Sequence, residues 1–200
     1  SNISIIGNGS DTTILDGGGI ASAISIDSEE TNVLLSDFKI INGLGESFFP
    51  VNPPLSADYS YTIGAAIHAD SETLNLTITN MTIEGNSNGS AISLHNGTYD
   101  LNNVIISNNS NNIDLGGALF TIHGSALSIH NSNFNAENIY MNGNSNILSS
   151  ANESIILGGV VSLVGSNGTL SKSEITDNSS YYFHVGSSSI IKSSLFNSGN

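Results

Sequence analysis

Two segments of this chain repeat one pattern at a fixed distance. Residues 89–109 (GSAISLHNGTYDLNNVIISNN) and residues 124–144 (GSALSIHNSNFNAENIYMNGN) match in residue type at nearly every position, at an offset of 35. Apolar and polar residues alternate in both copies, which indicates half-buried strands rather than a helix. A unit that recurs at a fixed period is the signature of a repeat architecture. The pattern therefore constrains how the whole chain can fold.

One polar residue marks the same point of the unit along the chain, just before its second strand. Equivalent positions are Asn2, Asp37, Asn80, Asn103, Asn138, Ser173 and Ser194. Their spacings are 35, 43, 23, 35, 35 and 21, so the basic coil has about 21–23 residues and the longer coils carry insertions. Side chains repeated at one position of stacked coils lie about 4.8 Å apart. We expect these seven residues to form a structural ladder.

The first strand of the unit recurs as well. Its copies are residues 23–26, 66–69, 91–94, 126–129, 160–163 and 182–185. Short strands at such a period cannot bury a face alone, but stacked coils bury a continuous core. The sequence predicts one all-β domain over residues 1–200, a right-handed parallel β-helix (a β-solenoid). The alternative is an antiparallel sandwich, which also uses short strands but needs no fixed register.

The insertions all follow the second strand of a coil, at roughly 44–62, 110–122 and 145–157. Because they share one position, they are expected along one edge of the solenoid, where repeat proteins often bind their partners. The first insertion holds all three prolines and four aromatic residues, which are Phe48, Phe49, Tyr59 and Tyr61. Proline is expected to keep it out of the sheet. The four aromatic side chains either shield the solenoid flank or form a ligand-binding surface.

The charge balance excludes several classes of partner. The net charge is -14, with three lysines and no arginine. Such a chain repels phosphate backbones and anionic membranes, so nucleic acid binding and membrane insertion are not expected. The chain has no cysteine, so disulfides and Cys-based zinc sites are excluded. The strand pattern runs up to both ends, and we expect this sequence to be part of a longer protein.

Histidines, acidic residues and Asn-x-Ser/Thr sequons are the candidates for metal and sugar sites in this chain. His95 and His130 occupy one position of adjacent coils, but two imidazoles without a third ligand make a weak zinc site, so stacked surface histidines are expected. No cofactor is predicted; calcium is the alternative, because six acidic residues lie in or near turns. They are Asp11, Asp16, Asp27, Asp70, Asp114 and Glu153. Asn-x-Ser/Thr sequons in turns, such as those of Asn88, Asn96 and Asn167, suit an exported glycoprotein.

Several motifs resemble one superfamily. The stretch GNGSDTTILDGGG, GAAI at 64–67, GGAL at 116–119, IEGN at 83–86 and MNGN at 141–144 look like pectate-lyase-like proteins. Within that superfamily the chain is similar to adhesin-like surface proteins of methanogenic archaea and to polymorphic outer-membrane proteins of bacteria. The resemblance covers nearly the whole chain and implies the β-helix fold. It also implies an extracellular, cell-surface setting and adhesion to a protein or glycan of another cell.

The superfamily also includes pectin-degrading enzymes. Pectate lyases pair calcium-bound acidic clusters with a basic residue, usually Arg, which this chain lacks. Lys39, Lys172 and Lys192 have no neighbouring cluster of carboxylates in the adjacent coils of the predicted register. We therefore predict a non-catalytic adhesin or stalk segment. The alternatives are a polysaccharide lyase or hydrolase, which needs paired carboxylates facing one cleft, and a purely structural spacer.

Overall fold

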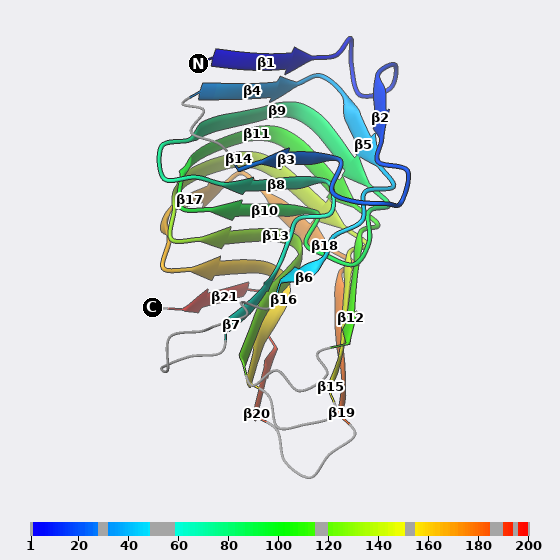
Figure 1. Cartoon of the computed structure of the whole chain (residues 1–200), viewed down its shortest axis with the longest axis vertical. Helices are drawn as coiled ribbons and strands as arrows, with labels where there is room; N and C mark the ends of the chain where they lie inside the picture. The colour runs from blue at the N-terminus through cyan, green and yellow to red at the C-terminus, as the bar shows by residue number, and fades with distance from the viewer. Residues whose placement is uncertain are drawn as a thin grey trace.

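The computed structural model describes residues 2–27, 32–48, 59–114, 120–150, 155–184, 190–193 and 196–199. Over these residues the fold is all-β, and its strands form two large sheets and one small one. Nearly all strand pairs are parallel; the exception in the described residues is the short pair β6–β7. Strands far apart in the sequence stack side by side in Figure 1. The solenoid-like architecture that the repeat predicts is present, and the antiparallel sandwich is wrong.

Sheet A has nine strands, and six of them follow one another from coil to coil. The six are β1 (Asn2–Ile6), β4 (Asn32–Ser36), β9 (Asn75–Glu84), β11 (Thr98–Ser107), β14 (Asn133–Asn142) and β17 (Asn167–Ser171). Beyond a bend, the sheet continues in β2 (Ile14–Asp16), β5 (Lys39–Ile41) and β18 (Glu174–Thr176). In Figure 1 β1 lies at one end of this stack.

Sheet B faces sheet A across the core and also has nine strands. Its members are β3 (Ile24–Ile26), β8 (Ile67–Asp70), β10 (Ile92–His95), β13 (Phe120–His130), β16 (Ile155–Val164), β20 (Ile190–Ser193) and β21 (Phe196–Gly199), with β6 (Ser47–Phe48) and β7 (Tyr59–Thr62). Five predicted copies of the first strand are confirmed in this sheet. Residues 23–26, 66–69, 91–94, 126–129 and 160–163 fall in or overlap β3, β8, β10, β13 and β16, in that order.

The insertions form a lobe on one side of the solenoid. After sheet A the chain enters sheet C, which consists of β12 (Ser110–Asp114), β15 (Ser145–Ser150) and β19 (Ser179–His184). It returns along the first halves of β13 and β16 and along β7 and β20, which extend sheet B. Figure 1 shows these segments descending together from the stacked coils. All of these insertions leave the coil at the same point. The residues at that point pair from coil to coil, Leu44 with Ser87, Ser87 with Ser110 and Ser110 with Ser145.

Two details of the predicted repeat are wrong. Residues 182–184 belong to β19 in sheet C, and the sixth strand of the series is β21, in which Phe196 pairs with Val161. The first insertion is also not wholly outside the sheet, although its three prolines lie outside the described residues. Its two ends form the antiparallel pair β6–β7, and β7 pairs with β13.

The core lies between sheets A and B and is built from columns of inward-facing residues. One column runs through Val33, Leu76, Tyr99 and Phe134, and all four side chains are buried. On β9, β11 and β14 the outward-facing neighbours are largely exposed polar residues, so these strands alternate as the sequence does. Among the described residues, no helix is long and apolar enough to cross a membrane.

Candidate binding site

Sheet A bends at a row of residues with left-handed backbone. Asp37, Asn80, Asn103, Asn138 and Lys172 have φ between 49° and 62°. Asn and Asp tolerate this conformation better than most residues, which explains why the sequence places them at this point. Asn80 donates its amide to Asp37 Oδ1 at 3.1 Å, and Asn103 donates to Asn80 Oδ1 at 2.9 Å. We call these five residues the bend row.

Four of the seven predicted ladder residues, Asp37, Asn80, Asn103 and Asn138, lie in this row. Asn2 lies at the start of β1 and pairs with Asn32, so it stands in another row. Ser173 is one residue past Lys172, and its hydroxyl accepts a hydrogen bond from the Ile139 amide at 3.1 Å. Ser194 falls outside the described residues. The unequal length of the first coil explains the shift of Asn2, since β1 and β4 pair at an offset of 30.

A groove of roughly 370 Å³ lies against the bend row, between it and the loop of residues 8–12. We call it the bend groove. It is lined by Asn8, Gly9, Ser10, Asp11, Thr12, Asp37, Asn80, Met81, Thr82, Asn103 and Ile105. Of the two apolar lining residues, Met81 is buried, so amides, carboxylates and hydroxyls surround one exposed apolar side chain, Ile105, which is 44% exposed. Polar hydrogen-bonding groups beside an apolar surface are suited to a polar ligand with carbon–hydrogen faces.

The loop that forms one wall of the bend groove is fixed by its own hydrogen bonds. Thr12 donates its hydroxyl to the Asn8 carbonyl at 2.6 Å, and the Asn8 amide donates to the Thr13 hydroxyl at 2.8 Å. The Gly9 amide donates to the Asp37 carbonyl at 2.8 Å, which ties the loop to the bend row. The sequence places Asp11 in or near a turn but does not predict the groove. The available signal was the run of Asn, Gly, Ser and Asp at residues 8–11, which is typical of a turn.

A second row, deeper in the structure, was also missed. Asn86, Asn109, Asn144 and Asn178 form what we call the Asn ladder, and the first three are at most 1% exposed. Asn109 Oδ1 accepts from the Asn86 backbone amide at 3.0 Å, and Asn144 Oδ1 accepts from the Asn109 amide at 3.1 Å. Each side-chain amide donates to backbone carbonyls of its own or the preceding coil. In the sequence, this row is marked by the final Asn of two repeated motifs, Asn86 of IEGN and Asn144 of MNGN.

Three histidines stack in sheet B. The rings of His68 and His95 have centroids 5.6 Å apart, and those of His95 and His130 are 4.6 Å apart. His95 and His130 each meet a serine hydroxyl of their own strand, Ser93 at 2.8 Å and Ser128 at 3.0 Å. All three imidazoles are buried, so the expectation of surface histidines is wrong.

Burial makes protonation of this stack unfavourable. Desolvation, followed by the neighbouring imidazoles His130 and His68, lowers the pKa of His95 to about 3. Desolvation lowers the pKa of His130 to about 4 and also lowers that of His68, against the attraction of Asp70 and Asp27. The stack is neutral near pH 7 and serves as packing. In the described part of the chain, no group of three or more His, Asp or Glu is placed to hold a metal ion.

The predicted aromatic ligand surface is only partly placed. Phe48 pairs with Tyr61 across β6 and β7, and Tyr59 lies beside Phe120 of β13. The backbones of these three residues therefore meet at the root of the lobe, while their side chains and the whole of Phe49 lie outside the described part of the structure.

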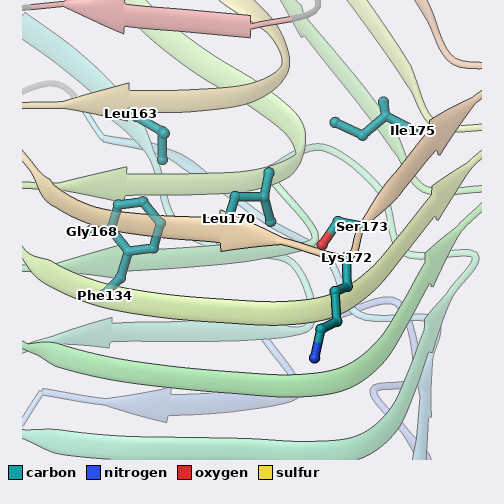
Figure 2. A pocket seen from close by; sticks show the side chains of 7 residues that line it. All are labelled: Phe134, Leu163, Gly168, Leu170, Lys172, Ser173 and Ile175. Atoms are coloured by element: carbon teal, nitrogen blue, oxygen red, sulfur yellow. The ribbon is translucent and has the colours of Figure 1, made fainter.

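The last coil holds a hollow of about 450 Å³ with both apolar and polar lining, which we call the end hollow. Figure 2 shows its lining, which consists of Phe134, Leu163, Gly168, Leu170, Lys172, Ser173 and Ile175. Leu163, Leu170 and Ile175 are only partly buried, although their counterparts in earlier coils are fully buried. Lys172 bonds the Glu137 carboxylate, which raises the pKa of Lys172.

Comparison with known proteins adds no relative to this description: no family model, no curated protein and no solved structure matches the chain.

Proposed function

We propose that this chain is a non-catalytic segment of a cell-surface protein. It is a right-handed solenoid stalk that presents the bend groove to a glycan or glycan-bearing protein on another cell. The observation that carries the proposal is the lining of that groove, where amides, carboxylates and hydroxyls flank the exposed Ile105. Sugar rings offer hydroxyls to such polar groups and carbon–hydrogen faces to an apolar side chain. An extracellular setting follows from adhesion and is part of the proposal.

The scaffold beneath the groove supports this role. Asp37, Asn80 and Asn103 belong to three successive coils, and their side chains are joined by hydrogen bonds at about one strand spacing. The groove is therefore preorganised, and a ligand would lose little affinity to ordering of the site. The lobe rises from another part of the coil, and its aromatic residues Phe48, Phe49, Tyr59 and Tyr61 remain a second candidate surface in the same proposal.

A glycan array probed with the whole chain tests the proposal. The blocking variant is Ile105→Glu, which places a charge on the apolar side of the groove. The matched control is Tyr140→Glu, because Tyr140 occupies the paired position one coil further, is 43% exposed and lies outside the groove lining. We expect bound glycans to be lost with Ile105→Glu and kept with Tyr140→Glu.

Three other outcomes would contradict the groove proposal. Equal binding by both variants would place the ligand elsewhere, and replacing Tyr59 and Tyr61 with Ala would then test the lobe. Absence of binding to any glycan or cell surface would favour the structural spacer. New reducing ends or unsaturated products from polygalacturonate would favour the lyase or hydrolase.

A further inference from the structure

The hydrogen bonds along the bend row run in one direction and end on a carboxylate. Asn103 donates its side-chain amide to Asn80 Oδ1 at 2.9 Å, and Asn80 donates its own amide to Asp37 Oδ1 at 3.1 Å. Asn103 Oδ1 receives no hydrogen bond from the described residues, so it keeps its capacity as an acceptor. All three residues line the bend groove. This side of the groove therefore uses part of its donor capacity internally and ends in the Asp37 carboxylate.

The loop on the other side of the bend groove has the same bias toward acceptors. The Thr12 hydroxyl donates to the Asn8 carbonyl at 2.6 Å, so its proton is held within the loop and its oxygen lone pairs remain. Asp11 lies next to it, is exposed, and adds a second carboxylate to the lining. Acceptors thus predominate on both sides of the groove. A ligand that fits this pattern supplies hydrogen-bond donors.

No cation balances the two carboxylates within the described lining of the groove. Lys39 pairs with the lining residue Thr82, but its ammonium bonds Glu84 Oε2 at 3.1 Å. A sugar with a carboxylate or sulfate would bring further negative charge against Asp11 and Asp37, in a chain whose net charge is -14. Like charges placed opposite each other suppress binding. The groove therefore disfavours anionic sugars and favours a positive charge.

We propose that the bend groove binds an amino sugar whose amine is free and protonated. The ammonium donates to the carboxylates of Asp11 and Asp37, the sugar hydroxyls donate to the remaining oxygen acceptors, and a carbon–hydrogen face of the ring lies on Ile105. Hydrogen bonds between charged partners are stronger than those between neutral ones, so the amine provides the selectivity. This inference rests on the proposed function, because it names the class of sugar for the same groove.

Three oligosaccharides that differ in charge test the selectivity. Oligomers of glucosamine and of N-acetylglucosamine with the same linkage differ only in the acetyl group, and an oligogalacturonate supplies the anionic sugar. Calorimetry with the whole chain at about pH 6, where a primary amine is protonated, measures each affinity. We expect the glucosamine oligomer to bind more tightly than the acetylated one and the galacturonate not to bind. Added salt should weaken binding of the glucosamine oligomer, because it screens the charges.

Charge-neutral variants of nearly the same shape assign the preference to the two carboxylates. Asp11→Asn and Asp37→Asn each remove one charge, and asparagine already occupies the position of Asp37 in the next two coils, as Asn80 and Asn103. Each variant should bind the glucosamine oligomer about two- to fivefold more weakly and the acetylated oligomer as before. The matched control is Asp100→Asn, an exposed position on β11 outside the described groove lining, which should bind like the wild-type chain.

A further variant separates failure of this inference from failure of the proposed function. Ile105→Ser removes the apolar contact without adding charge, so it reports on the groove for a sugar of any charge. Weaker binding of all sugars by Ile105→Ser, without a preference for the free amine, would overturn this inference alone. Binding that Ile105→Ser leaves unchanged would place the sugar elsewhere and overturn both.

The remaining outcomes concern the ligand itself. Tight binding of the oligogalacturonate would overturn the inference, and so would an equal loss of binding with Asp100→Asn, which would assign the effect to overall charge. A lysine oligomer that binds as tightly as the glucosamine oligomer and competes with it would assign the groove to a basic peptide. That result would overturn the inference as well.

Discussion

Asparagine has two distinct roles in this chain, and backbone conformation separates them. In the bend row, Asn80, Asn103 and Asn138 occupy the left-handed region, where a short amide side chain is tolerated at the surface. In the Asn ladder, buried amides satisfy backbone groups at the turn into the lobe. Both rows repeat once per coil, so the sequence signals the repeat clearly but does not tell the two roles apart.

Removing one member of the Asn ladder is expected to cost more than removing an exposed amide. In Asn109→Ala the Asn86 backbone amide loses its acceptor and the Ile83 carbonyl loses a donor. A buried unsatisfied group costs about 1–3 kcal/mol, and urea unfolding should show a loss of that order. The control Asn102→Ala removes an exposed amide from β11, the strand that leads into the turn of Asn109, and should change stability by less than about 0.5 kcal/mol. Equal losses would contradict the ladder's role.

At the scale of the element, sheet B joins three coils through its histidines on β8, β10 and β13. Edge-to-face rings at 4.6 and 5.6 Å pack the strands together and remain neutral in the folded chain. Two of them also bond serines on their own strands. The stack therefore makes the stability of sheet B depend on pH.

The folded pKa of His95 and His130 lies below the ordinary value near 6.5, so the unfolded chain binds more protons in acid. The free energy of unfolding should be level above about pH 6.5 and fall as pH drops from there toward 4. One pKa unit corresponds to about 1.4 kcal/mol, so the loss should be on the order of a few kcal/mol. Urea unfolding at several pH values measures it. His95→Gln, which cannot be protonated, should flatten the slope; an unchanged slope would assign it to other groups.

The lobe is an addition to a coil that folds without it. Between Asn75 and Thr98 the chain completes a coil in 23 residues, turning at Asn88 and Gly89. Replacing residues 111–124 with Asn-Gly gives the next coil that same turn, and we expect sheets A and B to keep their stacking. Circular dichroism and a single unfolding transition would confirm this. Loss of the β signal would show that the stack requires the lobe strands of that coil.

The sequence predicted the stacking accurately because alternation and period are local signals. Columns such as Ile67, Ile92, Leu127 and Val161 follow directly from the aligned repeats. Sheet C could not be predicted, because the insertions that form it vary in length. Its strands β12, β15 and β19 pair with one another and show no repeated sequence pattern. The bend groove brings residues 8–12 against three later coils, a contact that no repeat encodes.

Over the whole molecule, charge opposes the compact state. A chain with net charge -14 and three cations repels itself at pH 7, and the two ion pairs in the described residues, Lys39–Glu84 and Lys172–Glu137, involve partly or largely exposed groups. Sodium chloride should therefore raise the melting temperature, because the screening length falls from about 30 Å at 0.01 M to about 3 Å at 1 M. In low salt, Asp100→Asn should raise it too, since it removes one exposed negative charge while keeping an amide oxygen that can accept the hydrogen bond from Asn135. The same substitution should have little effect in 1 M salt. A melting temperature that falls on adding salt would mean that the ion pairs outweigh the repulsion.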